Sequence, residues 1–389
     1  MMNVSSYRSD EFQETFSNID RRHLSGIEYK IDRLRAVPIV AYGFLLIIGI
    51  AGNVWVACVI GCVLGERRTR APKCVQIYIL ALCMCDMIVL LFSLALIVDL
   101  VSGEWLIESV FLCRLYLSSE SLNKFCAPFL LVALSYFCYV KICQPSGAFR
   151  SRRGKKFGPD HNAGHNGHWT TGALMVVLCS IVISFALLTP VYIYGDLHYI
   201  VYENETGPLA IVTKCAFEPS ERVLTMFTIY GFILSYAAPA TLFTCFHAAI
   251  LYRVRKQAYE TVGARRRTHG GYLIRVTQTI LGLVVFYVLC WTPYWIMIMW
   301  QALTPLDGHG EMTDTGVVLN YFVHMLPYVN CTGYPILYTL LNKDIRQAYK
   351  KAFSKRQLAI EQEFSGRFSF YRSTNVRGTT GSTNELTSV

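Results

Sequence analysis

Seven long stretches of mostly apolar residues dominate this chain of 389 residues. Each is long enough to cross the ~30 Å hydrocarbon core of a bilayer as a helix, which takes roughly 20 apolar residues. Lipid offers backbone amides no hydrogen-bond partner, so a helix, which satisfies its own backbone, is the structure expected for each stretch. We predict membrane-spanning helices over residues 36–64, 75–101, 110–142, 169–194, 223–252, 272–302 and 317–340.

Composition supports a membrane location, because 53% of the residues are hydrophobic and only 16% are charged. These proportions exclude an ordinary soluble domain. The predicted fold class is an all-α membrane protein, a bundle of seven transmembrane helices followed by a short amphipathic eighth helix. We divide the chain into an extracellular tail (1–35), the transmembrane domain (36–340), the amphipathic helix (341–354) and a disordered cytoplasmic tail (355–389).

Basic residues indicate the orientation, because Lys and Arg collect on the cytoplasmic side of a membrane protein. The formal net charge of +10 is therefore a topological signal and no reason to expect nucleic-acid binding. We predict a multi-pass protein of the plasma membrane with its N-terminus outside. The basic loops contain Arg67, Arg68, Arg70 and Lys73, then Arg150, Arg152, Arg153, Lys155 and Lys156, then Arg253, Arg255, Lys256, Arg265, Arg266 and Arg267.

The cysteines agree with this topology. Of the fourteen cysteines, only Cys113 and Cys215 fall in segments predicted to be outside, where conditions are oxidising. We therefore predict a disulfide between them. Two glycosylation sequons, at Asn3 and Asn204, also fall outside and are expected to carry glycans. The cysteines show no spacing typical of a metal site, and no metal is expected.

Several short motifs narrow the class of membrane protein. They are Gly52–Val54, Asp86, Trp105 before Cys113, Cys290–Pro293, Pro335–Tyr338 and the amphipathic segment 342–353. In this order and spacing the chain resembles the rhodopsin-like (class A) G-protein-coupled receptors over nearly its whole length. Residues 123–145 and 290–295 look most like the peptide-receptor branch that includes somatostatin, opioid and allatostatin receptors. The resemblance implies a neuropeptide receptor that signals by movement of the sixth helix.

Asp86 is an ionisable residue inside a span, which is costly and therefore indicates a function. The resemblance implies that the matching Asp holds a sodium ion, with Asn53, Asn123 and Asn330 at the partner positions. The alternative is an Asp that is hydrogen-bonded in the bundle without an ion. Ala127 favours this alternative, because it stands where the family usually offers a hydroxyl.

Two proline-containing motifs are candidates for conformational switches. Pro293 removes a backbone hydrogen bond and kinks the sixth helix, so it is a natural hinge. Trp291 stands at the position of the toggle under the ligand pocket in the family. Pro335 and Tyr338 belong to the matching motif of the seventh span.

The cytoplasmic face departs from the family pattern. Cys138 replaces the Arg of the Asp-Arg-Tyr motif, although Tyr139 remains, and His247 stands where a Tyr is usual. A Cys has neither the charge nor the reach of an Arg. These residues motivate an alternative, an atypical or scavenging receptor that binds peptide but signals weakly or only through arrestin.

The ligand pocket implied by the resemblance contains Glu120, Lys124, Trp291, Tyr294 and Tyr328. Glu120 stands where amine and opioid receptors pair an acid with a ligand cation. Lys124 follows four residues later on the same helix face, which favours an ion pair within the helix instead. The sequence leaves these two interpretations of Glu120 open.

The outer loops and the tail suggest partners. The acidic rim (Asp99, Glu104, Glu108, Asp307, Glu311 and Asp314) would attract a basic peptide or is simply solvated. The final residues, Thr387–Val389, are typical of a ligand for PDZ domains. A transporter is disfavoured because the halves show no repeat. The spacing of nucleophiles and bases does not suggest an enzyme.

Overall fold

A computed structural model describes seven parts of the chain, residues 3–8, 33–64, 72–143, 161–204, 207–260, 270–303 and 314–341, together with residues 354, 357 and 361. Nearly all of the predicted amphipathic helix (341–354) and of the tail (355–389), including Thr387–Val389, lies outside the described residues. So do most of the basic loops on which the predicted orientation depends.

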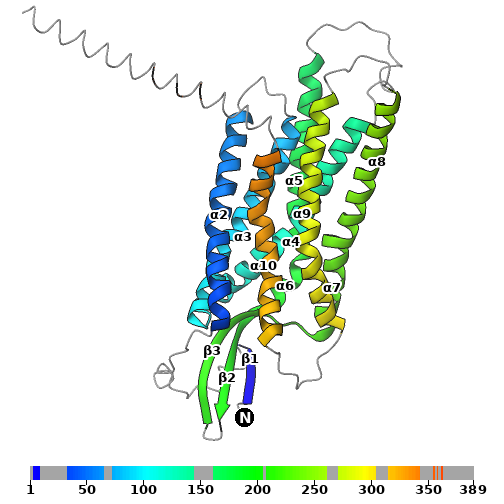
Figure 1. The fold of residues 1–389 in the computed structure, drawn as a ribbon. Helices are drawn as coiled ribbons and strands as arrows, with labels where there is room; N and C mark the ends of the chain where they lie inside the picture. The colour runs from blue at the N-terminus through cyan, green and yellow to red at the C-terminus, as the bar shows by residue number, and fades with distance from the viewer. Residues whose placement is uncertain are drawn as a thin grey trace, which may run out of the picture.

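Long helices run side by side and form a bundle (Figure 1). They are α2 (Arg33–Leu64), α3 (Lys73–Ser102), α4 (Val110–Cys143), α5 (His161–Leu187), α9 (Gly270–Leu303) and α10 (Asp314–Leu341). The remaining span consists of α7 (Glu221–Phe232), the π-helical turn η3 (Ile233–Ala237) and α8 (Ala238–Glu260), which follow one another without a break.

Six of these spans are long and apolar enough to cross a membrane by length and composition alone. The exception is α10, which is less apolar because it carries residues such as Asn320, His324 and Asn330. It nevertheless packs against α2 and α9 in the same bundle. The predicted bundle of seven transmembrane helices is confirmed.

Two spans differ from the continuous helices that were predicted. The prediction over residues 169–194 is corrected to two helices, because α5 ends at Leu187 and the short helix α6 (Thr189–Tyr194) follows. Pro190 lies in the first turn of α6, where its missing N–H costs no helical hydrogen bond. In the next span, Pro239 follows η3 directly. It cannot donate a hydrogen bond to a carbonyl of the preceding turn, which explains a local departure from α-helical geometry.

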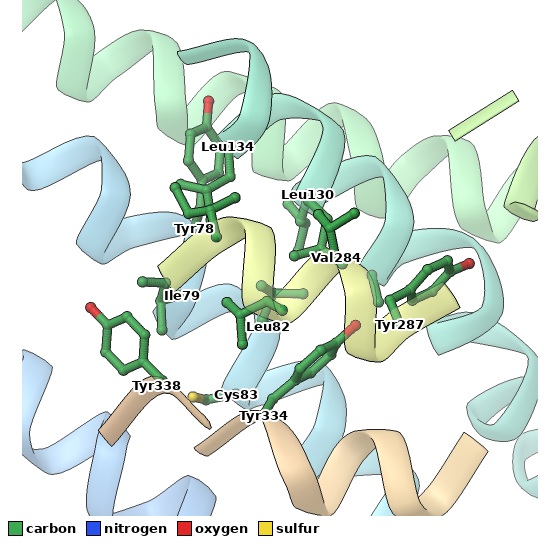
Figure 2. Packing of buried hydrophobic residues seen from close by; sticks show 14 of the residues in the cluster. Tyr78, Ile79, Leu82, Cys83, Leu130, Leu134, Val284, Tyr287, Tyr334 and Tyr338 are labelled. Carbon is green, nitrogen blue, oxygen red and sulfur yellow. The ribbon is translucent and has the colours of Figure 1, made fainter. Parts of the chain in front are cut away.

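The interior of the bundle is apolar and closely packed, whereas many large apolar side chains on its periphery are exposed, as expected for a surface that meets lipid. Leu130 and Leu134 of α4 are completely buried at its centre. Gly52 allows α2 to approach α10 closely, because a β-carbon there would lie 3.1 Å from Pro335. Figure 2 shows the surrounding cluster, which includes Tyr78, Ile79, Leu82, Cys83, Val284, Tyr287, Tyr334 and Tyr338.

A three-stranded antiparallel sheet projects from one end of the bundle (Figure 1). Its strands are β1 (Asn3–Arg8), β2 (Gly195–Asn204) and β3 (Gly207–Phe217), in the order β1-β2-β3. The sequence analysis did not predict it. The all-α description therefore holds for the membrane domain, and the sheet is an addition to it. We refer to this end of the molecule as the sheet end.

Candidate functional site

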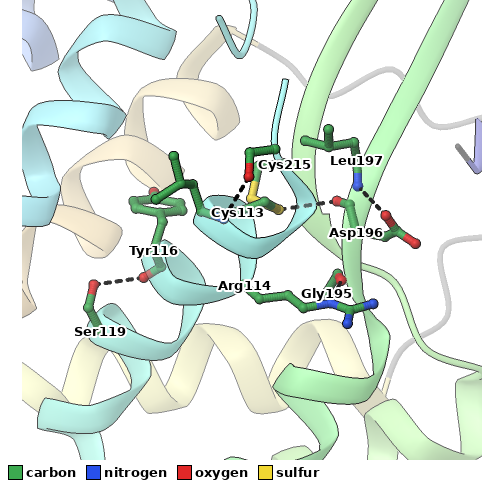
Figure 3. Close-up of a disulfide and its surroundings, with 10 residues drawn as sticks. Cys113, Arg114, Tyr116, Ser119, Gly195, Asp196, Leu197 and Cys215 are labelled. Carbon is green, nitrogen blue, oxygen red and sulfur yellow. Dashed lines mark hydrogen bonds between the residues drawn. A yellow bond between two sulfur atoms is a disulfide. The ribbon is translucent and has the colours of Figure 1, made fainter. Parts of the chain in front are cut away.

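The hairpin of β2 and β3 is fixed to the head of α4. As predicted, Cys113 and Cys215 form a disulfide, which joins the first turn of α4 to β3 (Figure 3). The Arg114 Nε donates a hydrogen bond of 2.8 Å to the carbonyl of Gly195, where β2 begins. On the other side, the backbone N–H of Trp105 donates to the carbonyl of Thr213 at 2.8 Å. The hairpin is thus a rigid cap over the sheet end of the bundle.

An ion pair and a histidine–carboxylate contact reinforce this cap. Lys214 of β3 lies with its Nζ 2.8 and 3.0 Å from the two carboxylate oxygens of Asp99 at the end of α3. His198 of β2 lies with its Nδ1 3.0 Å from the carboxylate of Glu218. Asp99 belonged to the predicted acidic rim, and its charge is instead used within the protein. The rim is therefore less acidic toward a ligand than the sequence suggested.

Beneath the cap, Glu120 and Lys124 face each other one turn apart on α4. The Lys124 Nζ lies 3.6 Å from Glu120 Oε1, and both side chains are largely buried. The ammonium group also lies over the ring of Tyr294 of α9, 5.2 Å from its centre. The structure therefore contains the ion pair within the helix that the spacing of Glu120 and Lys124 favoured.

A cluster of aromatic rings extends from the Glu120–Lys124 pair toward the centre of the bundle. Tyr294 contacts Trp291 edge to face with ring centres 5.4 Å apart, and it contacts His324 of α10 in the same way at 5.6 Å. Tyr328 of α10 packs against Tyr42 of α2 with ring centres 5.2 Å apart. His324 was missed, although a polar residue in a span was a signal for it.

The predicted toggle residue is fully enclosed. Trp291 is 1% exposed and packs on Tyr287, one turn deeper in α9, with ring centres 5.8 Å apart. The hydroxyl of Tyr287 donates a hydrogen bond to the carbonyl of Ser235 in η3. Beside Pro293, the hydroxyls of Tyr236 and Thr292 lie 2.6 Å apart. Polar contacts therefore join α9 to the irregular turn of its neighbour at the level of the hinge.

A polar core lies further along the bundle, around Asp86. Three predicted members, Asn53, Asn123 and Asn330, are buried with it. The Asn123 Nδ2 donates to Asp86 Oδ1 at 3.1 Å and to the sulfur of Cys331 at 3.0 Å. Asn53 Nδ2 donates to the carbonyl of Cys331 at 3.1 Å. Cys331 is a member of this core that the sequence analysis missed.

The polar core contains acceptors that the described protein groups leave unused. They are Asp86 Oδ2, Asn53 Oδ1, Asn123 Oδ1 and Asn330 Oδ1, each buried and without a hydrogen-bond donor. Buried acceptors of this kind are costly unless water or an ion satisfies them. Carboxylate and amide oxygens are the ligands that hard cations prefer. The residues present therefore fit a small cation.

At the opposite end of the bundle, the residue that replaces the usual Arg is buried. Cys138 is 0% exposed among apolar neighbours. His247 lies with Nε2 3.4 Å from the hydroxyl of Ser135, so it connects α8 to α4. Tyr139 packs on Phe246 with ring centres 5.5 Å apart. Neutral contacts thus hold α4 and α8 together where the family pattern has a charged residue.

Comparison with known proteins decides the family. Residues 52–157 and 162–338 match the family described as 7 transmembrane receptor (rhodopsin family), which is more than half of the chain. The chain belongs to this receptor family. The protein is therefore a multi-pass membrane receptor and not an enzyme.

Several relatives of the receptor are known from animals. It is 30% identical over 311 residues, 78% of this chain and 72% of the relative, to the Probable G-protein coupled receptor npr-29 of Caenorhabditis elegans. It is 26% identical over 342 residues (82% and 68%) to Neuropeptide receptor 18 of the same organism. It is 24% identical over 310 residues (80% and 70%) to the rat Somatostatin receptor type 1.

The Glu120–Lys124 pair makes a first testable prediction for the receptor. Replacing Lys124 with Met leaves the Glu120 carboxylate largely buried without its partner, which is expected to cost about 1–3 kcal/mol of stability. The double variant Glu120→Gln/Lys124→Met removes both charges and is expected to recover most of that loss. Thermal unfolding of the purified receptor measures both effects. A double variant as unstable as Lys124→Met would show that the two charges do not interact.

Proposed function

We propose that the receptor is a neuropeptide receptor of the plasma membrane, with its N-terminus and the sheet end outside the cell. The observation that supports the proposal is the aromatic cluster of Tyr294, His324 and Trp291 beside the Glu120–Lys124 pair, in a bundle whose β2–β3 hairpin is fixed by a disulfide. Two relatives support a peptide ligand by their names, a neuropeptide receptor and a somatostatin receptor.

The chemistry of the pocket favours a peptide over a small amine. Lys124 already forms an ion pair with Glu120. The ammonium group of Lys124 would therefore repel a small amine, and the carboxylate of Glu120 is not free to act as its counter-ion. The ring of Tyr294 and the imidazole of His324 can stack with aromatic side chains of a ligand or contact its polar groups. A peptide supplies several such side chains at once, and it also has the length to contact the hairpin.

Transmission follows from the contacts of Trp291. A ligand group that pushes on Tyr294 also moves Trp291, because the two rings are in contact. Pro293 lies between them in sequence and removes one helical hydrogen bond, so α9 bends there more easily than elsewhere. The hydrogen bond from Tyr287 to Ser235 must rearrange when α9 moves. An outward swing of the far end of α9 would open the cytoplasmic face to a G protein.

We further propose that Asp86, Asn53 and Asn123 hold a sodium ion that favours the inactive state. When bound, such an ion supplies a positive charge that neutralises the Asp86 carboxylate. The support is that each of these three residues has a buried oxygen without a donor. Asn330 is buried nearby, whereas Ala127 contributes no oxygen.

Replacing Asp86 with Asn tests the sodium site. Sodium chloride is expected to raise the thermal stability of the unliganded wild type above its value in choline chloride. In Asp86→Asn this difference is expected to vanish, because the carboxylate that attracts the cation is gone. A sodium effect of the same size in the variant would rule out this site. So would its absence in the wild type.

The partners on the cytoplasmic side are a G protein, arrestin or both. Cys138 favours the second candidate function, an atypical receptor that binds peptide and signals weakly or only through arrestin, because it lacks the charge of the usual Arg. A PDZ protein at Thr387–Val389 remains a proposal from the sequence. The relatives named as G-protein coupled receptors favour G-protein coupling.

A peptide library applied to cells that express the receptor, with separate readouts for G protein and arrestin, tests the proposed function. We expect one peptide class to give a saturable G-protein response, and Cys138→Arg to add little to it. An arrestin response alone, with G-protein activation restored by Cys138→Arg, would establish the atypical receptor instead. Solute flux without any ligand would contradict both.

A further inference from the structure

The first strand of the chain occupies an edge of the hairpin. β1 pairs with β2 in antiparallel register along six residues, from Asn3 opposite Glu203 to Arg8 opposite His198. β2 pairs with β3 on its other side. An edge strand presents unpaired N–H and C=O groups to any extended chain of suitable length. β1 therefore fills the place where a further strand would add to β2.

The β3 edge of the sheet is anchored to the helices of the bundle. β3 is held to the helices by the Cys113–Cys215 disulfide, by the Trp105–Thr213 hydrogen bond and by the ion pair of Lys214 with Asp99. β1 is held by its backbone ladder with β2, and residues 9–32 of the chain separate it from α2. Main-chain hydrogen bonds are formed by any sequence that can adopt an extended conformation. The ladder of β1 can therefore be exchanged for that of another strand.

The register also gives a direction. The Arg8 end of β1 lies opposite His198 of β2. His198 is three residues from Gly195, whose carbonyl accepts a hydrogen bond from Arg114 at the head of α4. The Asn3 end lies opposite Glu203, beside Asn204 and the turn of the hairpin. A chain that runs as β1 does therefore points its carboxyl end at the mouth of the bundle. Both glycosylation sequons stand at the opposite, distal end of the sheet, where glycans would leave the mouth open.

We infer that the β2 edge is a strand-addition site for an extended peptide ligand, that β1 occupies this site in the unliganded receptor, and that the ligand enters with its carboxyl end toward the bundle. The inference rests on the proposed peptide-receptor function and names how the peptide is held. Because β1 is part of the same chain, it competes with a free strand at a high effective concentration. Weakening β1 then strengthens the binding of a free strand.

The probe is the hexapeptide Asn-Val-Ser-Ser-Tyr-Arg, a labelled copy of β1, applied to the full-length receptor. In Ser5→Pro/Ser6→Pro, one of two consecutive prolines removes a ladder N–H, because alternate residues of a strand point toward the partner. Ser5→Ala/Ser6→Ala is the matched control, since it keeps both N–H groups and loses the Asn3 sequon equally. We expect the proline variant to bind the probe at least ~10-fold more tightly than the alanine variant.

Hydrogen exchange of the amides of β2 verifies that the prolines free the edge. A freed edge that binds the probe no better than the alanine control overturns the inference. A photoreactive group at the carboxyl end of the probe is expected to label the region of His198 and the head of α4, and the reverse pattern would overturn the orientation. The library screen reports separately on peptide activation. If the library screen finds an activating peptide while the proline and alanine variants bind the probe equally, the strand-addition site is wrong and the proposed receptor function is unaffected.

Discussion

Replacing Cys215 with Ser is expected to remove peptide binding and most of the receptor from the cell surface. The disulfide joins residues 102 positions apart, and a crosslink that closes a loop of this length contributes up to about 4.7 kcal/mol in the chain-entropy model. Without it, the hairpin keeps the Arg114–Gly195 and Trp105–Thr213 hydrogen bonds but loses its covalent anchor on α4. Surface staining and thermal unfolding of the purified variant measure the loss.

The matched control for this prediction is Cys179→Ser. Cys179 is an exposed free thiol of α5, so its replacement is expected to change neither surface level nor unfolding temperature. Cys113→Ser should behave as Cys215→Ser does, and the two replacements together should cost no more than either alone. Two single variants with normal stability, or additive losses in the double variant, would contradict a bridge between these sulfurs.

Replacing Trp291 with Ala is expected to reduce signalling far more than ligand binding. The side chain is 1% exposed and contacts both Tyr294 and Tyr287, so truncation removes the link between pocket and hinge. Deleting a buried Trp costs about 3–5 kcal/mol of stability. We expect the maximal G-protein response, corrected for surface level, to fall at least ~10-fold, the equivalent of 1.4 kcal/mol.

Two further variants separate the switch from general damage. Trp300 lies on the same helix but is 69% exposed, so Trp300→Ala should signal normally. Trp291→Phe keeps an aromatic ring against Tyr294 and should retain much of the response with less loss of stability. If Trp291→Ala signals fully at equal surface level, or if it loses binding and signalling in parallel, the proposed path through Trp291 is wrong.

The membrane helices could be predicted from the sequence because hydropathy is a local property. Five of the predicted spans match helices of the structure within about three residues, as expected for helix ends. The Cys113–Cys215 bridge followed from topology, since no other cysteines were predicted outside. The members of the polar core followed from the resemblance, and burial of Asp86 with three Asn residues agrees with it.

Other features depend on contacts between distant segments. The pairing of β1 with β2 joins residues nearly two hundred positions apart in a register that no local pattern encodes. The break before Pro190 and the π-helical turn before Pro239 depend on how each helix accommodates its proline. The four-residue spacing of Glu120 and Lys124 predicted that the two side chains could pair. Only side-chain geometry could show that Lys124 also lies over Tyr294.

The central claim is that the receptor binds an extracellular peptide at its sheet end. The accessibility of the amino end on intact cells tests this claim most directly. The cells express a receptor with one epitope before Met1 and a different epitope after Val389. We predict that antibody stains the first epitope on intact cells and the second only after permeabilisation. Staining of the carboxyl end on intact cells, with the amino end hidden, would place the hairpin, its disulfide and the pocket on the cytoplasmic side and contradict the account.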